Sequence, residues 1–500
     1  MKMIYIIAAL LGFSVLAQSC SQSFLDTAPT SDYDETFVFS SMENAYAALN
    51  GMHKMMVGVM ETSPGKQDKL LDHGGYPAIM ITMEALGDDF VFPNVKDNLF
   101  ISDYQWNDHR KVDGKKPAFI YKFFYQLIAN ANKILEQIDQ VPGADNMRNL
   151  IKGEALAYRA LSHFWLVQLF AKRYDSQTDN TQAGVPLLLK SDIRKQARSS
   201  VAGVYKQITE DLNHSITLLS EKNIPERIYK THFNTAIVKG LRARVAMTMQ
   251  DWENAKKYSQ EAIQESGCTL MDREAYRKGF NDVTNSEWLW GFLQLPDQSL
   301  QDYSFAAFMC FDNNSISIQS TPKCISERLY NSIPASDVRK ELWMDPAQIP
   351  WVAPSANHTM APYMNRKFLT KGKKNLSDVC FMRLGELYLT LAEAQARLNE
   401  KDAAKTLYDL VKTRDPEYMQ SNNTGTALIE EILFQRRCEL WGEGFRFTDL
   451  KRLNQSLDRT NSNHEQSICI QLTTPAGDKT WEFLFPESET NANELIEQNP

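Results

Sequence analysis

Hydrophobic residues recur at helical spacing over much of the chain. Two adjacent apolar faces run along the segment 150–173, one formed by Leu156, Ala160, Phe164 and Val167 and the other by Ala157, Leu161, Trp165 and Leu169. A helix that is apolar over so wide an arc is expected to be buried. The segment 380–399 shows the same spacing, so we predict an all-α dominated fold.

The helical segments pair along the sequence as hairpins. The segment 233–263 predicts two antiparallel helices, and the second is entered through Asp251 and carries Ala255 and Ala262 along one side. Small residues let neighbouring helices approach, as in tetratricopeptide-like hairpins that stack into one core. Further pairs fit residues 118–140 with 150–173, and residues 380–399 with 401–413.

Two stretches lack this periodicity and are rich in Trp, Tyr, Asn, Asp and Pro. Within the second, Trp288 and Trp290 alternate with Leu289 as in a strand. Long loops on a helical scaffold usually carry the function. We therefore predict a single domain over residues 41–500, with a helical scaffold at about 41–59, 118–265 and 376–455 and a loop-rich binding region at about 60–117 and 266–375.

The first twenty residues have the layout of an export signal. A short apolar run ends in Leu16-Ala17-Gln18-Ser19-Cys20, which resembles a lipobox with Cys20 as the lipidated residue. Gln18 departs from the commonest lipobox, so a soluble periplasmic protein with an ordinary cleavage site stays the alternative. We expect a signal peptide at residues 1–19 and a lipidated tether at residues 20–40. No later stretch has the 18 consecutive apolar residues of a spanning helix.

Composition and charge exclude several classes of protein. The chain is 43% hydrophobic and 23% charged, as expected of a well-packed domain. Its formal net charge of −8 and the lack of a Lys/Arg-dense segment argue against nucleic-acid binding. The six cysteines after Cys20 are widely spaced and form no Cys-x-x-Cys pair, so we predict no zinc site built from them and no essential disulfide.

No catalytic constellation is evident in the sequence. The metalloprotease, serine-hydrolase, phosphate-loop and dinucleotide motifs are absent. The eight histidines are dispersed, and His163 on its apolar helix is interpreted as a hydrogen-bonded core residue. Asp88 and Asp89 are adjacent, and adjacent residues rarely face one cleft. We therefore interpret them as part of a turn and not as a glycosidase pair. We predict no enzyme, no metal site and no cofactor.

Several blocks stand in a characteristic order along the chain. They are Phe24-Leu25-Asp26 after Cys20, Ile128–Leu135 with paired asparagines, Gly153–Ala160, Gly184–Leu187, Arg437–Arg452 and Phe485–Asn493. The most specific is Arg437-Cys438-Glu439-Leu440-Trp441-Gly442-Glu443-Gly444-Phe445-Arg446. Together the blocks resemble the SusD/RagB-like family of nutrient-binding outer-membrane lipoproteins. We interpret the charges of the specific block as a structural ion-pair cluster at a helix end, which identifies the scaffold and not a ligand site.

This resemblance implies a fold, a location and partners. The fold is a tetratricopeptide-like helical scaffold with a loop-rich binding region, docked as a lid on a TonB-dependent barrel. The implied protein is lipid-anchored in the outer membrane at the cell surface, captures oligosaccharides and delivers them to a SusC-like TonB-dependent transporter. A peptide-binding uptake, adhesion or interaction lipoprotein is the alternative. Starch-like, host-glycan, plant-polysaccharide and peptide cargo are all compatible with the scaffold.

Oligosaccharide capture needs flat apolar platforms and side chains that hydrogen-bond hydroxyl groups. Trp106, beside Asn107 in the first loop stretch, is the leading candidate. Trp343, Trp351 and Tyr363 lie in a Pro-, Asn- and Met-rich stretch that suits a loop. Each of these aromatic residues could instead be packed in the core. Further polar candidates are Asn313, Asn314 and Asn357.

Overall fold

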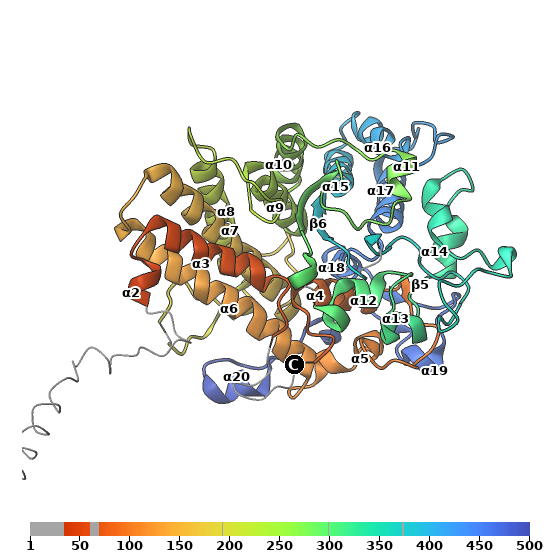
Figure 1. The fold of residues 1–500 in the computed structure, drawn as a ribbon, viewed down its shortest axis with the longest axis horizontal. Helices are drawn as coiled ribbons and strands as arrows, with labels where there is room; N and C mark the ends of the chain where they lie inside the picture. Colours follow the sequence, from red (N-terminus) through yellow and green to blue (C-terminus); the bar gives the residue numbers. More distant parts are fainter. Residues whose placement is uncertain (1–34, 61–69, 193, 299, 373–374) are drawn as a thin grey trace, which may run out of the picture.

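The scaffold is a row of helices in which successive helices pack side by side (Figure 1). The structure, a computed structural model, describes residues 35–60, 70–192, 194–298, 300–372 and 375–500, so the expected signal peptide and Cys20 lie outside the described residues. The main scaffold helices are α3 (Met42–Met55), α6 (Lys115–Gln137), α7 (Asp145–Phe170), α8 (Val201–Leu219), α9 (Thr235–Thr248), α10 (Trp252–Glu265), α15 (Leu384–Arg397), α16 (Ala403–Val411) and α17 (Gly425–Leu440).

The predicted hairpins are confirmed, and the reasons are local. The Asp251 carboxylate accepts the backbone N–H of Asn254 at 3.3 Å and starts α10 directly after α9. Ala255 and Ala262 are fully buried on α10, which packs against both α9 and α15. The pairs α6–α7, α9–α10 and α15–α16 therefore form much of the scaffold, and the all-α dominated class is correct.

Short strands fasten distant segments to this scaffold. Four antiparallel pairs are described, β1 (Phe90–Val91) with β5 (Cys324–Ile325), β2 (Ala183–Pro186) with β3 (Arg198–Ser200), β4 (Trp288–Phe292) with β6 (Val379–Arg383), and β7 (Leu457–Asp458) with β8 (Thr473–Thr474). The strand expected at Trp288 and Trp290 is confirmed as β4, and all five of its residues are buried. The β1–β5 pair links the two loop-rich stretches, and β4–β6 leads directly into α15.

The stretch 60–117 is less irregular than expected, because α4 (Gly75–Ala85) lies within it. All eleven residues of α4 are buried, so the helix has no polar face and gives no amphipathic pattern. The stretch 266–375 contains only short helices in its described part, namely α11 (Arg273–Tyr276), α12 (Phe305–Met309), α13 (Ile316–Ser320) and α14 (Glu327–Ser332). The remaining short helices are α2 (Glu35–Val38), α5 (Ile101–Tyr104), α18 (Arg446–Arg452), α19 (Gln466–Cys469) and α20 (Glu487–Ala492). No helix in the described ranges combines the length and apolarity that a bilayer crossing requires.

The turn after α17 is built from glycine and a buried carboxylate. Thr424 occupies the position before α17. Gly442 and Gly444 have φ angles of 80° and 89°, a region that favours glycine, and allow the chain to reverse before α18. The Glu84 carboxylate of α4 accepts the backbone N–H groups of Gly444 and Phe445 at 2.8 and 2.9 Å. This turn therefore joins α4 to the C-terminal end of α17.

Buried charges beside this turn are paired with distant partners. Glu439 accepts from Arg383 at 2.6 Å, from Arg414 at 2.9 Å and from Arg339 at 3.2 Å, and all four side chains are buried. Burial alone would raise the pKa of Glu439, but the three guanidinium groups hold it well below its usual range. The interpretation of this block as a structural ion-pair cluster is confirmed, although its partners come from other segments of the chain.

Asp88 and Asp89 belong to the same charged framework. Asp88 pairs with Arg446 at 2.5 Å, and Asp89 pairs with Arg437 at 2.6 Å. Both carboxylates are buried and satisfied by guanidinium groups, so they form no catalytic pair. The turn expected here is present at residues 86–89, and its two carboxylates are buried in ion pairs.

The segment 479–499 completes the core around the end of α7. The backbone N–H of Phe483 donates to the Leu169 carbonyl at 2.9 Å, and the Asn499 amide donates to the Phe170 carbonyl at 2.8 Å. Phe483 and Phe485 are fully buried. Carbonyl groups at the end of α7, which have no partner within the helix, are thus satisfied by residues far along the chain.

Candidate functional site

Trp106, the leading candidate for a sugar platform, is a core residue. Its side chain is 7% exposed and packs edge-on against Trp481, with ring centroids 4.8 Å apart. The indole N–H donates to the Leu86 carbonyl at 2.8 Å. The backbone at Trp106 has a φ of 56°, and the ring fills the space behind α5. The expectation of an accessible platform at Trp106 is therefore corrected, because neither ring face is open.

Trp343 is corrected for the same reason. Its side chain is 4% exposed and lies edge-on to Trp441 of the buried turn, with centroids 4.6 Å apart. The backbone at Trp343 does run through an irregular segment, as predicted. The side chain nevertheless anchors that segment to the core, so its ring cannot stack on a ligand.

Trp351 lies in a different environment, on an apolar ridge of the second loop stretch. Its ring is half-buried, and its indole N–H donates to the Asp345 carbonyl at 2.8 Å. The neighbouring side chains Ile349 and Val352 are 65% and 89% exposed. We call Ile349, Trp351 and Val352 the apolar ridge. The indole is held in place by one hydrogen bond while its surroundings remain open to solvent.

Tyr363 and Asn107 are also partly accessible. Tyr363 is half-buried, and its hydroxyl donates to the Glu327 carboxylate at 2.8 Å. Burial and Glu327 raise the pKa of Tyr363 to about 12, so the hydroxyl remains a donor at neutral pH. The Asn107 side chain is exposed at the start of the turn Asp108–Arg110.

A polar hollow of about 520 Å³ lies in the loop-rich region. We call it the amide hollow, and its lining residues are Pro296, Gln301, Asp302, Asn313, Asn314, Ser315, Asn375 and Leu376. Asn313 is buried and organises the wall, because its amide donates to the Asn375 carbonyl at 3.2 Å and accepts the Ser315 N–H at 2.7 Å. The wall of the hollow is thus fixed by the side chain of Asn313, which the sequence indicated only as a secondary candidate.

The rim of the amide hollow offers unused hydrogen-bonding groups. The side chains of Asn314 and Asp302 are exposed, and neither forms a hydrogen bond or ion pair within the described ranges. Amide and carboxylate groups can both accept from hydroxyl groups, and the amide can also donate. The arrangement suits a neutral, hydroxyl-rich ligand.

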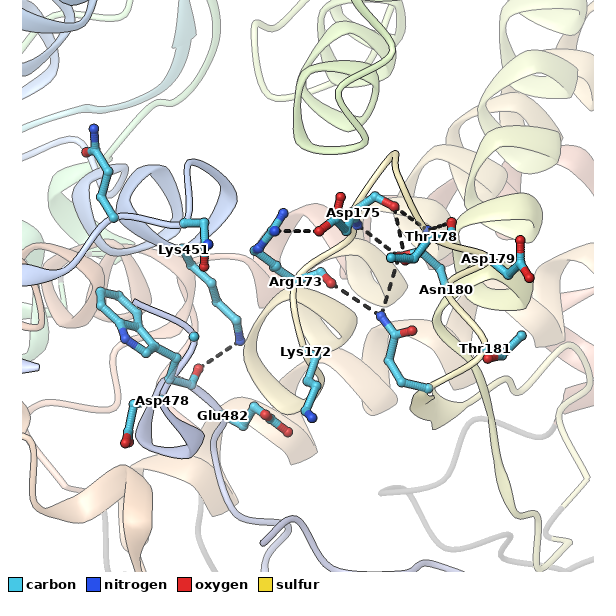
Figure 2. A pocket seen from close by; sticks show the side chains of 15 residues that line it. Lys172, Arg173, Asp175, Thr178, Asp179, Asn180, Thr181, Lys451, Asp478 and Glu482 are labelled. Atoms are coloured by element: carbon cyan, nitrogen blue, oxygen red, sulfur yellow. Dashed lines mark hydrogen bonds and ion pairs between the residues drawn. The ribbon is translucent and has the colours of Figure 1, made fainter. Parts of the chain in front are cut away.

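A second cavity, of about 570 Å³, has a charged wall (Figure 2). It lies between the loop 172–182 and the segments around Lys451 and Asp478. Arg173 pairs with Asp175 at 2.5 Å. The Asn180 side chain closes the loop by accepting the Asp175 N–H at 2.9 Å and donating to the Asp175 carbonyl at 2.8 Å. The Asp175 and Asn180 oxygens are therefore engaged by protein groups.

Lys451 has a structural role at the back of this second cavity. Its ammonium group donates to the carbonyls of Gln168, Ala171 and Trp481 at 2.7 to 2.8 Å. Burial lowers the pKa of Lys451 to about 7, an effect that the negative charge of Glu482 opposes. Because Lys451 and the Arg173–Asp175 pair are already satisfied, the amide hollow fits a neutral ligand better than this cavity does.

One group of residues could hold a metal ion within the described part of the chain. It consists of His53, Glu154 and His232, whose ligand atoms all lie within 4.8 Å of one another. Glu154 and His232 are 78 residues apart in the sequence, so no local motif announces the group. Helical spacing of histidines in the sequence could not reveal this group, because only the tertiary fold brings Glu154 and His232 together.

Comparison with known proteins identifies the family. A model described as "SusD family" matches residues 170–500, which is two thirds of the chain, and one described as "Starch-binding associating with outer membrane" matches residues 23–247. A SusD-like protein of Bacteroides ovatus is 21% identical over 309 residues, covering 57% of this chain and 48% of the relative. The chain thus aligns with about half the length of that relative.

Solved structures agree over nearly the whole chain. A SusD-like carbohydrate binding protein of Bacteroides vulgatus is 25% identical, with a TM-score of 0.78, and the match covers 92% of this chain and 98% of that protein. A SusD superfamily protein of Bacteroides thetaiotaomicron has a TM-score of 0.75 at 23% identity, covering 92% and 100%. Members of this family are non-catalytic binding proteins, which confirms the prediction that the chain is no enzyme. The chain belongs to the SusD family.

Proposed function

We propose that this protein captures oligosaccharides at the cell surface and delivers them to a SusC-like TonB-dependent transporter. The observation that carries the proposal is the amide hollow, whose rim residues Asn314 and Asp302 have free hydrogen-bonding groups. Hydroxyl groups of a sugar match these acceptors and donors without needing a charged partner. The similar Bacteroides vulgatus protein is described as carbohydrate binding, which agrees with this chemistry.

The apolar ridge supplies the second element of a sugar site. Trp351 has an indole on which a sugar face can stack, and Ile349 and Val352 extend the apolar surface beside it. Tyr363 and Asn107 remain further candidates for ligand contacts. We assign hydrogen bonding to the amide hollow and apolar contact to Trp351, with capture and no cleavage as the result.

The same proposal includes attachment to the outer membrane through a lipid on Cys20. It rests on the lipobox-like sequence before Cys20 and on the description of the matching family as associating with the outer membrane. α2 lies at the end of the proposed tether and α3 follows it, so the anchor would connect to the scaffold.

The test measures glycan binding by the full-length protein in detergent. Migration in native gels containing starch, plant polysaccharides or host glycans reports binding, and chromatography of each mixture reports any released product. We expect retardation by one glycan class without product. Trp351→Ala and the double change Asn314→Ala with Asp302→Ala should each weaken binding at least tenfold, since each removes a contact worth more than about 1.4 kcal/mol. Labelling with a fatty-acid analogue, lost in Cys20→Ser, tests the anchor.

Matched controls separate loss of contact from loss of structure. Met419 is 82% exposed and Asn422 is exposed, and both lie in the connection between α16 and α17, outside the amide hollow and the apolar ridge. Met419→Ala and Asn422→Ala should bind as the unchanged protein does. Binding of peptides alone would contradict glycan capture and support the peptide-uptake alternative, and released sugars would contradict the non-catalytic assignment.

A further inference from the structure

Three scaffold segments bring imidazole and carboxylate groups together. His53 lies near the end of α3, Glu154 lies in α7, and His232 lies just before α9. The His53 Nε2 atom is 3.0 Å from Glu154 Oε2, and the His232 Nδ1 atom is 3.0 Å from Glu154 Oε1. The two imidazole rings are 4.0 Å apart between centroids, and all three side chains are buried.

We propose that His53, Glu154 and His232 bind a divalent transition metal ion, zinc in particular, through His53 Nε2, His232 Nδ1 and the Glu154 carboxylate. Zinc is bound by His nitrogen and carboxylate oxygen at about 2.0 to 2.2 Å, so neighbouring ligand atoms of a tetrahedral site lie about 3.3 Å apart. The two nitrogen to oxygen distances of 3.0 Å require an outward movement of only a few tenths of an ångström.

The hydrogen bonding around the cluster favours a metal over a closed hydrogen-bond network. The Glu154 carboxylate hydrogen-bonds with His232 Nδ1 and with the backbone N–H of Phe233, whereas the buried His53 Nε2, 3.0 Å from Glu154 Oε2, lacks hydrogen-bond geometry to it. A buried polar atom without a partner is rare and needs a physical reason. A nitrogen lone pair directed at a shared metal ion is one such reason.

The outer nitrogens of both rings have the partners that metal-binding histidines usually have. The Tyr158 hydroxyl is 2.6 Å from His53 Nδ1, and the Tyr46 hydroxyl is 3.4 Å from His232 Nε2. When one ring nitrogen binds a metal, the other carries the proton and donates to a neighbouring oxygen, which fixes the ring orientation. Both tyrosine oxygens are placed to accept such a proton.

The ion would join elements that the hairpin packing connects only side by side. α3 packs against α7, and His232 leads into α9, so one ion links three elements of the scaffold. Three protein ligands leave a fourth position for water beside the half-buried Tyr46. The inferred role is to fasten the first long helix after the tether to the rest of the scaffold.

The experiment titrates zinc sulfate into the full-length protein in detergent after treatment with a chelator. We expect one zinc ion per chain by elemental analysis, a dissociation constant below micromolar by competition with a zinc dye, and an increase in Tm. Cobalt(II) chloride should give visible ligand-field absorption from a site containing nitrogen ligands. His232→Gln and Glu154→Gln should weaken zinc binding at least 100-fold.

His163→Gln provides the matched control, because His163 is equally buried on α7 but lies outside the cluster. This variant should bind zinc as tightly as the unchanged protein. If a cluster variant does not fold, the stoichiometry and cobalt spectrum of the unchanged protein still decide the matter. No zinc bound per chain, or zinc binding that survives His232→Gln in a folded variant, would overturn the proposal. Glycan binding is measured separately, so its failure would leave the metal assignment standing.

Discussion

The helical scaffold and the loop-rich region are held together by different means. In the scaffold, long helices pack side by side, and buried ion pairs such as Glu439 with Arg383 and Arg339 join it to the loop-rich region. In the loop-rich region, single side chains bridge to distant backbone, as when the Asn365 amide donates to the Met309 carbonyl at 2.8 Å and the Asn94 amide to the Ser320 carbonyl at 3.2 Å. A region that is held by a few side-chain to backbone hydrogen bonds can tolerate substitutions between them, which suits a region that selects ligands.

The largest effect expected from this difference concerns the buried charges. Glu439→Gln removes one charge and leaves three buried guanidinium groups undercompensated, which should lower the free energy of unfolding by about 3 to 5 kcal/mol. Because the pKa of Glu439 is lowered in the fold, its contribution is present at neutral pH and is lost as the pH falls below about 4.5. Urea unfolding followed by circular dichroism measures the change.

Glu430→Gln is the control for this charge, since Glu430 is exposed on the same helix α17. It should change the free energy of unfolding by less than about 0.5 kcal/mol. If the two substitutions lowered the free energy of unfolding equally, the buried ion pairs of Glu439 would contribute no more to stability than an exposed charge does.

A second, pH-dependent effect is expected at the turn after α17. Burial raises the pKa of Glu84 to about 7, although the backbone N–H groups of Phe445 and Gly444 oppose the shift. Between about pH 4.5 and 7 the folded chain holds a proton that the unfolded chain has released, so this carboxyl makes the fold less stable as the pH rises through that window. The shift corresponds to about 3 kcal/mol.

Glu84→Gln should remove this dependence, because the amide oxygen can still accept the same two N–H groups. The difference in unfolding free energy between the variant and the unchanged protein should therefore grow in favour of the variant from pH 5 to pH 8. Glu43→Gln, on an exposed position of α3, should leave the pH profile unchanged. A difference that stays constant over this range would show that Glu84 ionises normally in the fold.

The smallest effects are expected on the apolar ridge. Val352→Ala should alter the free energy of unfolding by less than about 0.5 kcal/mol, since the side chain is 89% exposed. Val238→Ala, the matched change in the buried face of α9, should cost about 2 kcal/mol. Thermal and urea unfolding of the two variants compare the regions directly, and similar losses would contradict the distinction between them.

Much of the scaffold could be predicted from the sequence, because its helices are amphipathic or continuously apolar over long stretches. α4 was missed because a short, wholly buried helix shows no periodicity.

The candidate site was harder to predict, since burial of a side chain depends on tertiary packing. Trp106 and Trp343 do lie in irregular backbone, yet both rings turn inward against Trp481 and Trp441. The amino-acid composition of a loop predicts an irregular backbone, but it does not predict in which direction a large side chain points. Asn313 belongs to the amide hollow because Asn375, 62 residues away, folds against it.

The contact between Asn499 and the end of α7 has a consequence for the order of folding. The Phe170 carbonyl accepts a hydrogen bond from Asn499, which lies 329 residues further along the chain, and Phe483 fills the core beside it. Neither the Asn499 amide nor the Phe483 side chain is available until that part of the chain has been synthesised. The α7 region should therefore reach its final packing only after residue 499 has emerged from the ribosome.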